Sequence, residues 1–363
     1  MSSKSTPYSV LPASAYWRTG VAEPGLWGLN GLWKSRWALP ADTRFSTYGS
    51  CFAQHISRAL VARKLAWVNA EPAPSRTPED IALSFNYGIF SARTANIYTA
   101  RQLLMLTKMA CGQMEVDQPE IWQDRDRAYD SLRPAIEPNG FASMEEAYLS
   151  RMSMVRAFRR SIAEADLFIF TLGLTEGWES RATGLAYAMC PGTLAGTFDE
   201  SAHQFRNYGF TEIRSDLELA VALMRDINPD LRFVLTVSPV PLTATASGQH
   251  VLVATTRSKS VLRAVAGEIA EADPNVDYFP SYEIISGAPA RAMFFEPNMR
   301  SVAPQGVDFV MRHFFAGLNL SGSARAGLPA SSGFNDAETK IEAEAAAEDI
   351  VCEELTLETY NRA

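Results

Sequence analysis

The stretch "FSTYGSCFAQHISRAL" (residues 45–60) has the pattern of a strand, a tight turn and a helix. The residues up to Tyr48 end a short strand, and residues 52–63 carry apolar side chains at helical spacing. Gly49 permits the sharp turn between the two. A strand that leads directly into a helix is the first half of a βαβ unit, so this stretch predicts an α/β fold.

The same alternation continues along the chain. Apolar runs typical of buried strands occur at "DLFIFTLG" (166–173), "LRFVLTVSPVP" (231–241) and "VDYFPSYEI" (276–284). Amphipathic helices are predicted within "EIRSDLELAVALMRDINP" (212–229) and "TRSKSVLRAVAGEIAEA" (256–272). The middle, "WQDRDRAYDSLRP" (122–134) and "SMEEAYLSRMSMVRAFRRSIAEA" (143–165), is predicted to be a largely helical insert. Helices between strands favour a mainly parallel sheet with right-handed crossovers.

Composition divides the chain into three parts. Residues 1–44 hold four of the seven tryptophans and are interrupted by Gly and Pro, so we expect an arm that packs its aromatic rings on the main domain. Residues 45–318 form the α/β domain. Residues 319–363 are predicted to be a flexible linker and a solvated acidic tail, in which "EAEAAAEDIVCEEL" (342–355) can form a helix.

Charge and cysteine content exclude several classes of function. Residues 335–363 hold nine acidic and two basic side chains, a net charge of −7. The whole chain has a net charge of −8, so the residues before 335 have a net charge of about −1. Such a neutral body is not typical of a nucleic-acid-binding protein. No apolar run is long enough for a membrane span, and the absence of a secretory signal favours the cytoplasm. The four cysteines and four histidines are scattered, so we predict no metal and no other cofactor.

Reactive loops of parallel sheets gather where the strands end. The segments "YGSCF", "TLGLTEGWE" and "TVSPVPLTAT" each follow a predicted strand, so we expect them to lie together. Ser50 and Cys51 begin a helix, where free N–H groups can hold an oxyanion and the helix dipole lowers the pKa of a thiol. The alternative is structural, with Ser50 as a helix cap and Cys51 as a small buried side chain.

Four segments carry a family resemblance: "YGSCFAQHI", "TLGLTEGWE", "CPGTLAGTFDESAHQFRNYGF" and "LTVSPVPLTAT" with the helix after it. On these segments the chain, from about residue 43 to 315, is identified as a member of the GSCFA family. That family resembles the SGNH or GDSL hydrolases, which are flavodoxin-like α/β esterases, deacetylases and acyltransferases. The resemblance implies a three-layer α/β/α fold and acyl chemistry.

The resemblance also implies candidate site residues. The GDS turn of the hydrolases corresponds to Gly49-Ser50-Cys51, which puts Cys51 in the place of the nucleophilic serine, although a shift of one residue would select Ser50. Gly88 in "FNYGIFSARTANIYT" corresponds to the oxyanion glycine. In the third block Gly173 matches, and Thr175 replaces the oxyanion asparagine.

The largest departure from the hydrolase pattern concerns the general base. Asn298 and Ser301 stand where those enzymes have the aspartate and histidine of a DxxH pair. Without that imidazole, another base has to move the proton. His55, one helical turn after Cys51, and His203, in a loop-rich insert, are the candidates. The alternative for each is a structural histidine.

Two further candidates have charged side chains. Glu176 follows a buried strand, where burial would raise the pKa of its carboxyl group, and it is interpreted as a base, a substrate ligand or a helix cap. Lys259 near a helix start is interpreted as a ligand for an anionic sugar or phosphate, or as a solvated cation.

The leading functional hypothesis is an ester hydrolase or acyltransferase that acts on acyl groups of a sugar or polysaccharide, with a small-molecule or glycan ester as its partner. A degenerate protein that binds a glycan or a protein partner is the alternative, since the DxxH pair is missing. A third hypothesis is thiol chemistry at Cys51, such as redox sensing.

Overall fold

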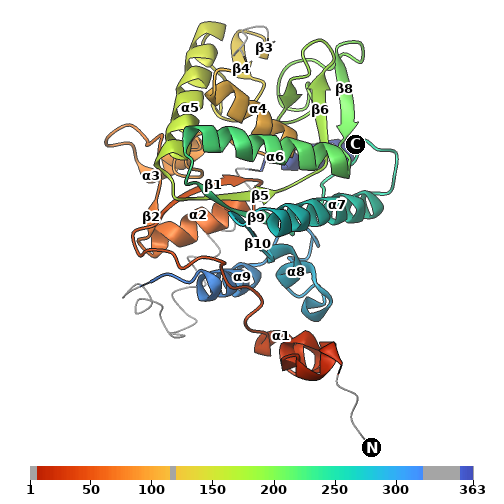
Figure 1. The fold of residues 1–363 in the computed structure, drawn as a ribbon. Helices are drawn as coiled ribbons and strands as arrows, with labels where there is room; N and C mark the ends of the chain where they lie inside the picture. Colours follow the sequence, from red (N-terminus) through yellow and green to blue (C-terminus); the bar gives the residue numbers. More distant parts are fainter. Residues whose placement is uncertain (1–5, 115–119, 322–351, 363) are drawn as a thin grey trace, which may run out of the picture.

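The central sheet of the computed structural model has five parallel strands in the spatial order β10-β9-β5-β1-β2 (Figure 1). The structure describes residues 6–114, 120–321 and 352–362. The strands of this sheet are β1 (Arg44–Gly49), β2 (Ala66–Trp67), β5 (Leu167–Leu172), β9 (Arg232–Val237) and β10 (Val276–Phe279). Numbered by their order along the chain they run 2-1-3-4-5, the order of the flavodoxin-like doubly wound fold. The predicted fold class is therefore confirmed.

Helices cover both faces of the sheet. One face carries α5 (Met144–Glu164), α6 (Phe210–Ile227) and α7 (Val251–Ala272), with α4 (Ala100–Ala110) packed on α6. The other face carries α2 (Ala53–Ala62), α8 (Ser281–Ser286) and α9 (Pro304–Gly317). Within the described ranges, no helix combines the length and the apolar character that crossing a bilayer requires.

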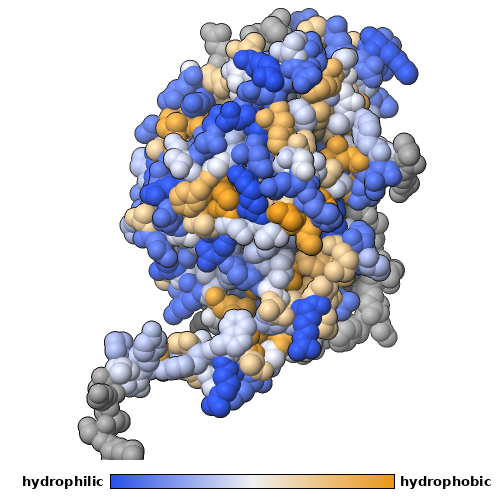
Figure 2. Space-filling model, turned by 90° about the vertical axis from the view of Figure 1, so that its right-hand side faces the viewer, coloured by the Kyte–Doolittle hydropathy of each residue, from blue (hydrophilic) through white to orange (hydrophobic). Residues whose placement is uncertain are grey.

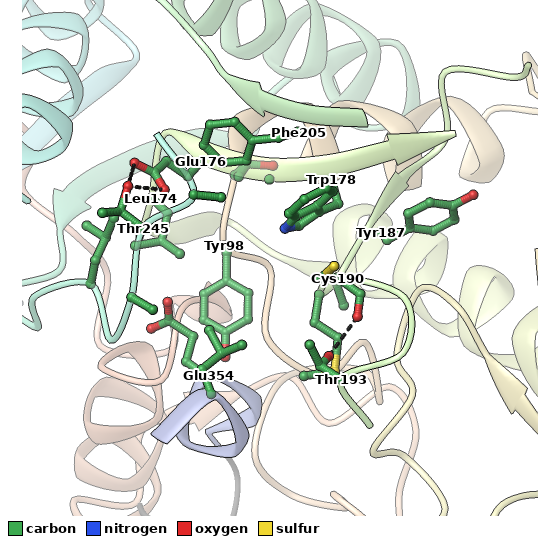
Figure 3. A pocket seen from close by; sticks show the side chains of 18 of the residues that line it. Tyr98, Leu174, Glu176, Trp178, Tyr187, Cys190, Thr193, Phe205, Thr245 and Glu354 are labelled. Atoms are coloured by element: carbon green, nitrogen blue, oxygen red, sulfur yellow. Dashed lines mark hydrogen bonds between the residues drawn. The ribbon is translucent and has the colours of Figure 1, made fainter. Parts of the chain in front are cut away.

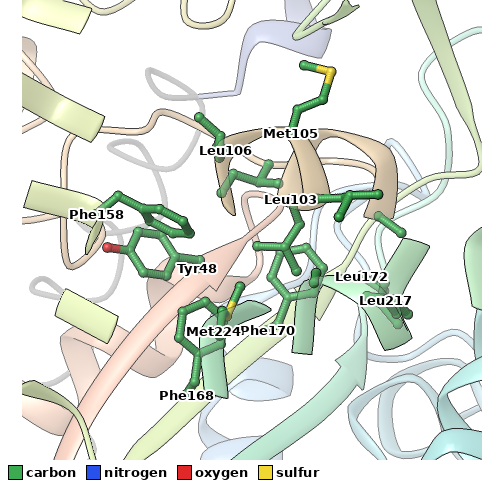
Figure 4. Close-up of a cluster of buried hydrophobic side chains, with 14 of the residues drawn as sticks. Tyr48, Leu103, Met105, Leu106, Phe158, Phe168, Phe170, Leu172, Leu217 and Met224 are labelled. Carbon is green, nitrogen blue, oxygen red and sulfur yellow. The ribbon is translucent and has the colours of Figure 1, made fainter. Parts of the chain in front are cut away.

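The strands supply a hydrophobic core on each side of the sheet, because successive side chains of a strand point to opposite faces. In β5, Phe168 and Phe170 belong to the core under α4, α5 and α6, whereas Leu167 and Ile169 belong to the core under α2 and α9. Figure 4 shows the first of these cores. All four side chains are buried. Burial of such a side chain contributes about 1.5–3 kcal/mol, so both faces stabilise the sheet.

The insert between β2 and β5 is helical in α3 (Glu79–Ser84), α4 and α5, but the helix expected over residues 122–134 is wrong. These residues form a hairpin of β3 (Ile121–Asp124) and β4 (Arg127–Asp130). Two β-prone aromatic residues explain the difference, since Trp122 and Tyr129 lie opposite each other in the hairpin register.

A second sheet follows β5 directly. Its three antiparallel strands have the order β7-β6-β8. They are β6 (Glu176–Ser180), β7 (Ala186–Tyr187) and β8 (His203–Asn207). The sequence predicts only a loop-rich insert here. The register pairs Glu176 with Asn207, so the end of β8 lies beside the start of β6, close to the central sheet.

Several aromatic residues of the N-terminal arm pack on the domain, among them Trp27, which lies edge-on to Phe294 and Phe309. The ring of Trp33 stacks on Phe314 of α9, with ring centroids 5.6 Å apart, and Trp37 Nε1 donates a hydrogen bond to the Pro274 carbonyl oxygen. Trp17 is 66% exposed, and the start of the arm extends away from the body (Figures 1 and 2). Most of the predicted linker and of the predicted tail helix lies outside the described residues.

A buried ion-pair cluster fixes the hairpin to α5. The carboxylate of Asp130 accepts hydrogen bonds from Arg133 Nε at 2.7 Å and from Arg151 Nη2 at 2.5 Å, and all three side chains are buried. Replacing Asp130 by asparagine leaves two buried guanidinium groups without their carboxylate. We expect the Asp130→Asn variant to lose about 3–5 kcal/mol of unfolding free energy, measured by urea denaturation.

The matched control is Asp166→Asn. Asp166 pairs with Arg44 at 3.0 Å, but both side chains are about half exposed, so we expect a loss of less than about 1 kcal/mol. Burial alone would raise the pKa of Asp130, but Arg151 and Arg133 hold that pKa below its ordinary value. The contribution of Asp130 is therefore present above the ordinary carboxyl pKa and is lost as the pH falls through the lower folded value. Equal losses in the two variants would contradict this assignment.

Candidate functional site

The turn after β1 lies where the strand order reverses, between β1 and β5. Gly49 has φ +140°, and a Cβ atom on it would lie 2.4 Å from the carbonyl oxygen of Thr171 in β5. The Ser50 N–H donates to the same oxygen at 3.1 Å. Glycine is required here because no side chain fits between the two strands. The turn therefore occupies the topological switch point, where doubly wound sheets bind their ligands.

The three segments that follow the strands meet at this edge, as predicted. The N–H groups of Gly173 and Leu174 both donate to the Tyr98 carbonyl oxygen, at 3.1 and 2.9 Å. A Cβ atom on Gly173 would lie 2.9 Å from the Cβ atom of Ser50. The Ser238 N–H, after β9, donates to the Leu172 carbonyl oxygen at 2.8 Å. The close approach of these backbones places the three predicted reactive segments side by side.

The two candidate nucleophiles face different surroundings. Ser50 is 3% exposed, it packs against Gly173, and its hydroxyl oxygen has no hydrogen-bond partner within the described part of the chain. Cys51 is 4% exposed and interacts electrostatically with Lys259 and Arg300. Nearby cations favour a thiolate, so the surroundings of Cys51 suit a nucleophile better than those of Ser50.

Lys259 brings an amine to the same place from α7. It is 1% exposed, and its Nζ donates a 2.8 Å hydrogen bond to the Gly173 carbonyl oxygen. Burial lowers the pKa of Lys259 to about 8, against the opposing attraction of Glu354 and Cys51. An amine with that pKa is neutral in a substantial fraction near pH 8, so it can accept a proton. The sequence predicts Lys259 only as an anion ligand or a solvated cation.

Two side-chain hydrogen-bond donors that the sequence does not predict lie beside the turn, next to Gly173. Asn96 Nδ2 and the Tyr98 hydroxyl donate to the same carboxylate oxygen of Glu353, at 2.6 and 2.8 Å. Asn96, Tyr98 and Glu353 are all buried. Asn96 and Tyr98 belong to the segment quoted for Gly88, but single polar residues in a loop carry little signal of such a role.

The turn around Asn298 and Ser301 supplies a cation. Asn298 Nδ2 donates to the Ser301 hydroxyl at 3.0 Å, so these two residues bond to each other in a turn. Arg300 lies between them in the sequence, and its Nη2 donates to a Glu354 carboxylate oxygen at 2.9 Å. The same nitrogen is 3.8 Å from the sulfur of Cys352. The turn at residues 298–301 therefore contributes a guanidinium group.

Thr175 and Glu176 lie at the start of β6 with their polar groups already bonded. The Thr175 hydroxyl donates to Asn207 Oδ1 at 2.8 Å, a bond that uses its proton. Both carboxylate oxygens of Glu176 lie within hydrogen-bond distance of the Thr245 hydroxyl, at 2.7 and 2.9 Å (Figure 3). Burial raises the pKa of Glu176, against the Thr245 hydrogen bond. The contact between Glu176 and Thr245 fixes the loop after β9 to the second sheet.

The candidate histidines and Gly88 take other positions. His55 packs on the ring of Phe52, with centroids 5.3 Å apart, and interacts electrostatically with Asp308 of α9. His203 pairs with Ser180 at the far end of β6, about 13 Å of strand beyond Glu176. Its Nδ1 accepts a hydrogen bond from the Asp199 N–H. Gly88 has φ +73° in a turn, and a Cβ atom there would meet no other atom within 4 Å.

A cavity of about 320 Å³ opens beside the charged groups. Tyr98 and Glu354 form the side toward the turn, and the second sheet and its loops form the other walls (Figure 3). The lining is largely apolar and aromatic, including Trp178, Tyr187 and Phe205. Cys190 also lines it, and burial raises the pKa of this thiol to about 11. A cavity of this kind suits an acyl chain or the face of a sugar ring.

Comparison with protein families gives a match over most of the chain. The family model named GSCFA family matches residues 44–314, which is more than half of the chain. No curated protein matches the sequence. The matched residues include the turn at Gly49, Lys259 and Arg300, and they end before the C-terminal residues 352–362.

Proposed function

The chain belongs to the GSCFA family, and from the geometry of its site we propose that it is a cysteine-dependent ester hydrolase or acyltransferase. The observation that carries the proposal is the buried amine of Lys259, which is hydrogen-bonded to Gly173 at the switch point of the sheet and interacts electrostatically with Cys51. This pair supplies a nucleophile and a base where the DxxH histidine is missing. The acyl group of a sugar or polysaccharide as substrate follows from the resemblance to the SGNH and GDSL hydrolases.

The first half of the reaction acylates Cys51. The neutral amine of Lys259 accepts the thiol proton, and the sulfur attacks the carbonyl carbon of the ester. The carbonyl oxygen becomes an oxyanion that accepts hydrogen bonds from Asn96 Nδ2 and the Tyr98 hydroxyl, the two donors that hold a Glu353 carboxylate oxygen in this structure. The bond to the leaving oxygen then breaks, and that oxygen takes the proton from the Lys259 ammonium.

The second half releases the acyl group. Water, or the hydroxyl group of an acceptor, gives its proton to Lys259 and attacks the thioester carbonyl carbon. The carbon–sulfur bond breaks, and the sulfur recovers the proton from Lys259. Water as the attacking group gives hydrolysis, and an acceptor hydroxyl group gives acyl transfer.

The charges of the site select the substrate. Lys259 is a buried cation, Arg300 has only 11% of its side chain exposed, and both lie next to the carboxylate of Glu354. Buried cations without an anion are costly, so a ligand that takes the place of Glu354 has to bring a negative charge. We therefore infer that the acyl ester is carried by an anionic sugar or polysaccharide, whose apolar part enters the neighbouring cavity.

The test is to trap the acyl-enzyme. Full-length protein is mixed with p-nitrophenyl acetate or an acetylated uronic acid, stopped with acid and analysed by peptide mass spectrometry. We expect one acetyl group on the Cys51 peptide, removable by hydroxylamine, in the wild type and in Ser50→Ala. In the double variant Glu353→Gln/Glu354→Gln the C-terminal residues bind the site less tightly. We therefore expect Cys51 of this variant to be acylated faster than in the wild type. Acetyl groups spread over surface lysines, or found on Ser50, would contradict the proposal.

A glycan-binding protein without catalysis is the second candidate, favoured by the aromatic walls of the cavity. In that case no acyl group appears on Cys51, but an anionic sugar changes the fluorescence of Trp178 with a saturable dependence on concentration. The variant Trp178→Phe identifies the tryptophan that reports the binding.

A further inference from the structure

The C-terminal residues cover the turn that carries Cys51. The sequence predicts a solvated tail, but Cys352 is 7% and Glu353 4% exposed, so for these residues the prediction is wrong. The 3-10 helix η7 (Glu353–Arg362) follows and places Leu357 and Tyr360 in the wall of the cavity. Figure 3 shows Glu354, at the start of η7, beside Tyr98. We call residues 352–361 the C-terminal segment.

Charge-assisted hydrogen bonds hold this segment in place. Glu353 is bound by Asn96 and Tyr98, and Glu354 by Arg300. At the other end of the segment, the Tyr360 hydroxyl lies 3.2 Å from the Gly192 carbonyl oxygen. Hydrogen bonds to charged groups are the strong ones in proteins. The acidic pair therefore positions the residue before it, Cys352, at a defined place.

That place is against Cys51. Both side chains belong to the same buried cluster of the α2 and α9 side. The Cys51 thiol donates a hydrogen bond to the Cys352 sulfur, and this bond, with the nearby Arg300, lowers the pKa of Cys352 although burial opposes the change. By contrast, burial raises the pKa of both Cys111 and Cys190. Two thiols in contact, one of them with enhanced thiolate character, are the starting arrangement for disulfide formation.

We propose that Cys51 and Cys352 form a reversible disulfide, with a peroxide as the oxidant, which fastens the C-terminal segment over the site. The Cys352 thiolate attacks one oxygen of hydrogen peroxide, the O–O bond breaks, and the hydroxide that leaves takes a proton to become water. The Cys51 sulfur then attacks the Cys352 sulfenic acid, and its thiol proton leaves with the sulfenic oxygen as a second water. Two thiols and one peroxide give one disulfide and two waters.

The disulfide blocks the reaction directly if Cys51 is the nucleophile, a consequence that rests on the proposed function. The sulfur of Cys51 is then bonded, and the segment cannot leave Asn96, Tyr98 and Arg300. A dithiol reductant restores both thiols by exchange. The formation of the bond itself depends only on the two side chains and their contact, so it can be tested without any assay of activity.

The experiment is disulfide mapping of the full-length chain. Reduced protein is treated with stoichiometric hydrogen peroxide, blocked with iodoacetamide, digested without reductant and analysed by mass spectrometry. We expect the four thiols of the chain to fall to two, with Cys51 joined to Cys352, and to return to four with dithiothreitol. The Cys111→Ser variant should give the same bond, and Cys352→Ser should leave Cys51 without a disulfide.

A variant that keeps both cysteines tests the role of the segment. Glu353→Gln/Glu354→Gln removes two charges that hold the segment, and we expect the disulfide to form about tenfold more slowly. The proposal is overturned if Cys51 is found joined to Cys111 or Cys190 as often as to Cys352. It is also overturned if Cys51 becomes a sulfinic acid while Cys352 remains a thiol, or if the double variant forms the bond as fast as the wild type.

Discussion

The Cys51→Ala variant is expected to lose acyl transfer from an acetylated anionic sugar, with kcat lowered at least about 10³-fold. The thiol supplies the atom that forms the acyl-enzyme, and Cys51 interacts electrostatically with both Lys259 and Arg300. The measurement is kcat by stopped-assay release of acetate. Unfolding in urea, followed in parallel, separates a loss of chemistry from a loss of structure.

Ser50→Ala is the matched control for Cys51→Ala. The Ser50 hydroxyl is buried against Gly173, so its removal is expected to change kcat less than about tenfold. The opposite result, with Ser50→Ala inactive and Cys51→Ala active, would identify Ser50 as the nucleophile. The one-residue shift that the sequence leaves open would then be the correct alignment.

The Lys259→Met variant is expected to lower kcat by about 10²–10⁴-fold. Methionine fills the buried site of the lysine without a charge, so we expect the fold to persist. In the wild type the activity should rise with pH around a midpoint near 8, because Lys259 has to be neutral to accept the thiol proton and its pKa is lowered to about 8 by burial. The variant should lack this rise.

Lys259→Arg distinguishes a base from a fixed positive charge. The guanidinium group stays protonated at every accessible pH. Unlike methionine, it keeps a positive charge that attracts the thiolate, but it cannot accept a proton. If Lys259 is the base, Lys259→Arg is as inactive as Lys259→Met. Recovery of most of the activity in Lys259→Arg would contradict the role of base and leave Lys259 as a charge partner of the thiolate.

The midpoint of the pH profile should also respond to Glu354. Glu354 raises the pKa of Lys259, against the lowering by burial. The loss of its charge in Glu354→Gln therefore shifts the midpoint to lower pH in reactions with an uncharged ester. With an anionic ester, whose own charge replaces that of Glu354, we expect a smaller shift.

The sequence by itself determined the fold class and the location of the reactive corner. The apolar run "DLFIFTLG" and the turn at Gly49 have local patterns, complete within about ten residues, that dictate a buried strand and a strand-to-helix turn. Parallel strands end at a common edge, so the meeting of the turn with Gly173 and Ser238 also followed from the sequence.

The hairpin of β3 and β4 was missed because helical and strand patterns are hard to distinguish in short polar segments. The pairing of Trp122 with Tyr129 depends on a turn of two residues, Arg125 and Asp126. Arg125 adopts φ +54° there, and nothing in its residue type requires that conformation.

Only the tertiary structure decided which charged residues surround Cys51. Lys259 reaches it from α7, Arg300 from the turn before α9, and Glu354 from the far end of the chain. Their identity as site residues depends on burial and on contacts between residues that lie hundreds of positions apart in the sequence. A single sequence holds no local signal for such contacts. The acids of the C-terminal segment look like solvent-exposed charges in the sequence. Glu353 is buried and Glu354 largely so, because the fold supplies Asn96, Tyr98 and Arg300 as their partners, and paired burial is the condition under which such charges leave water.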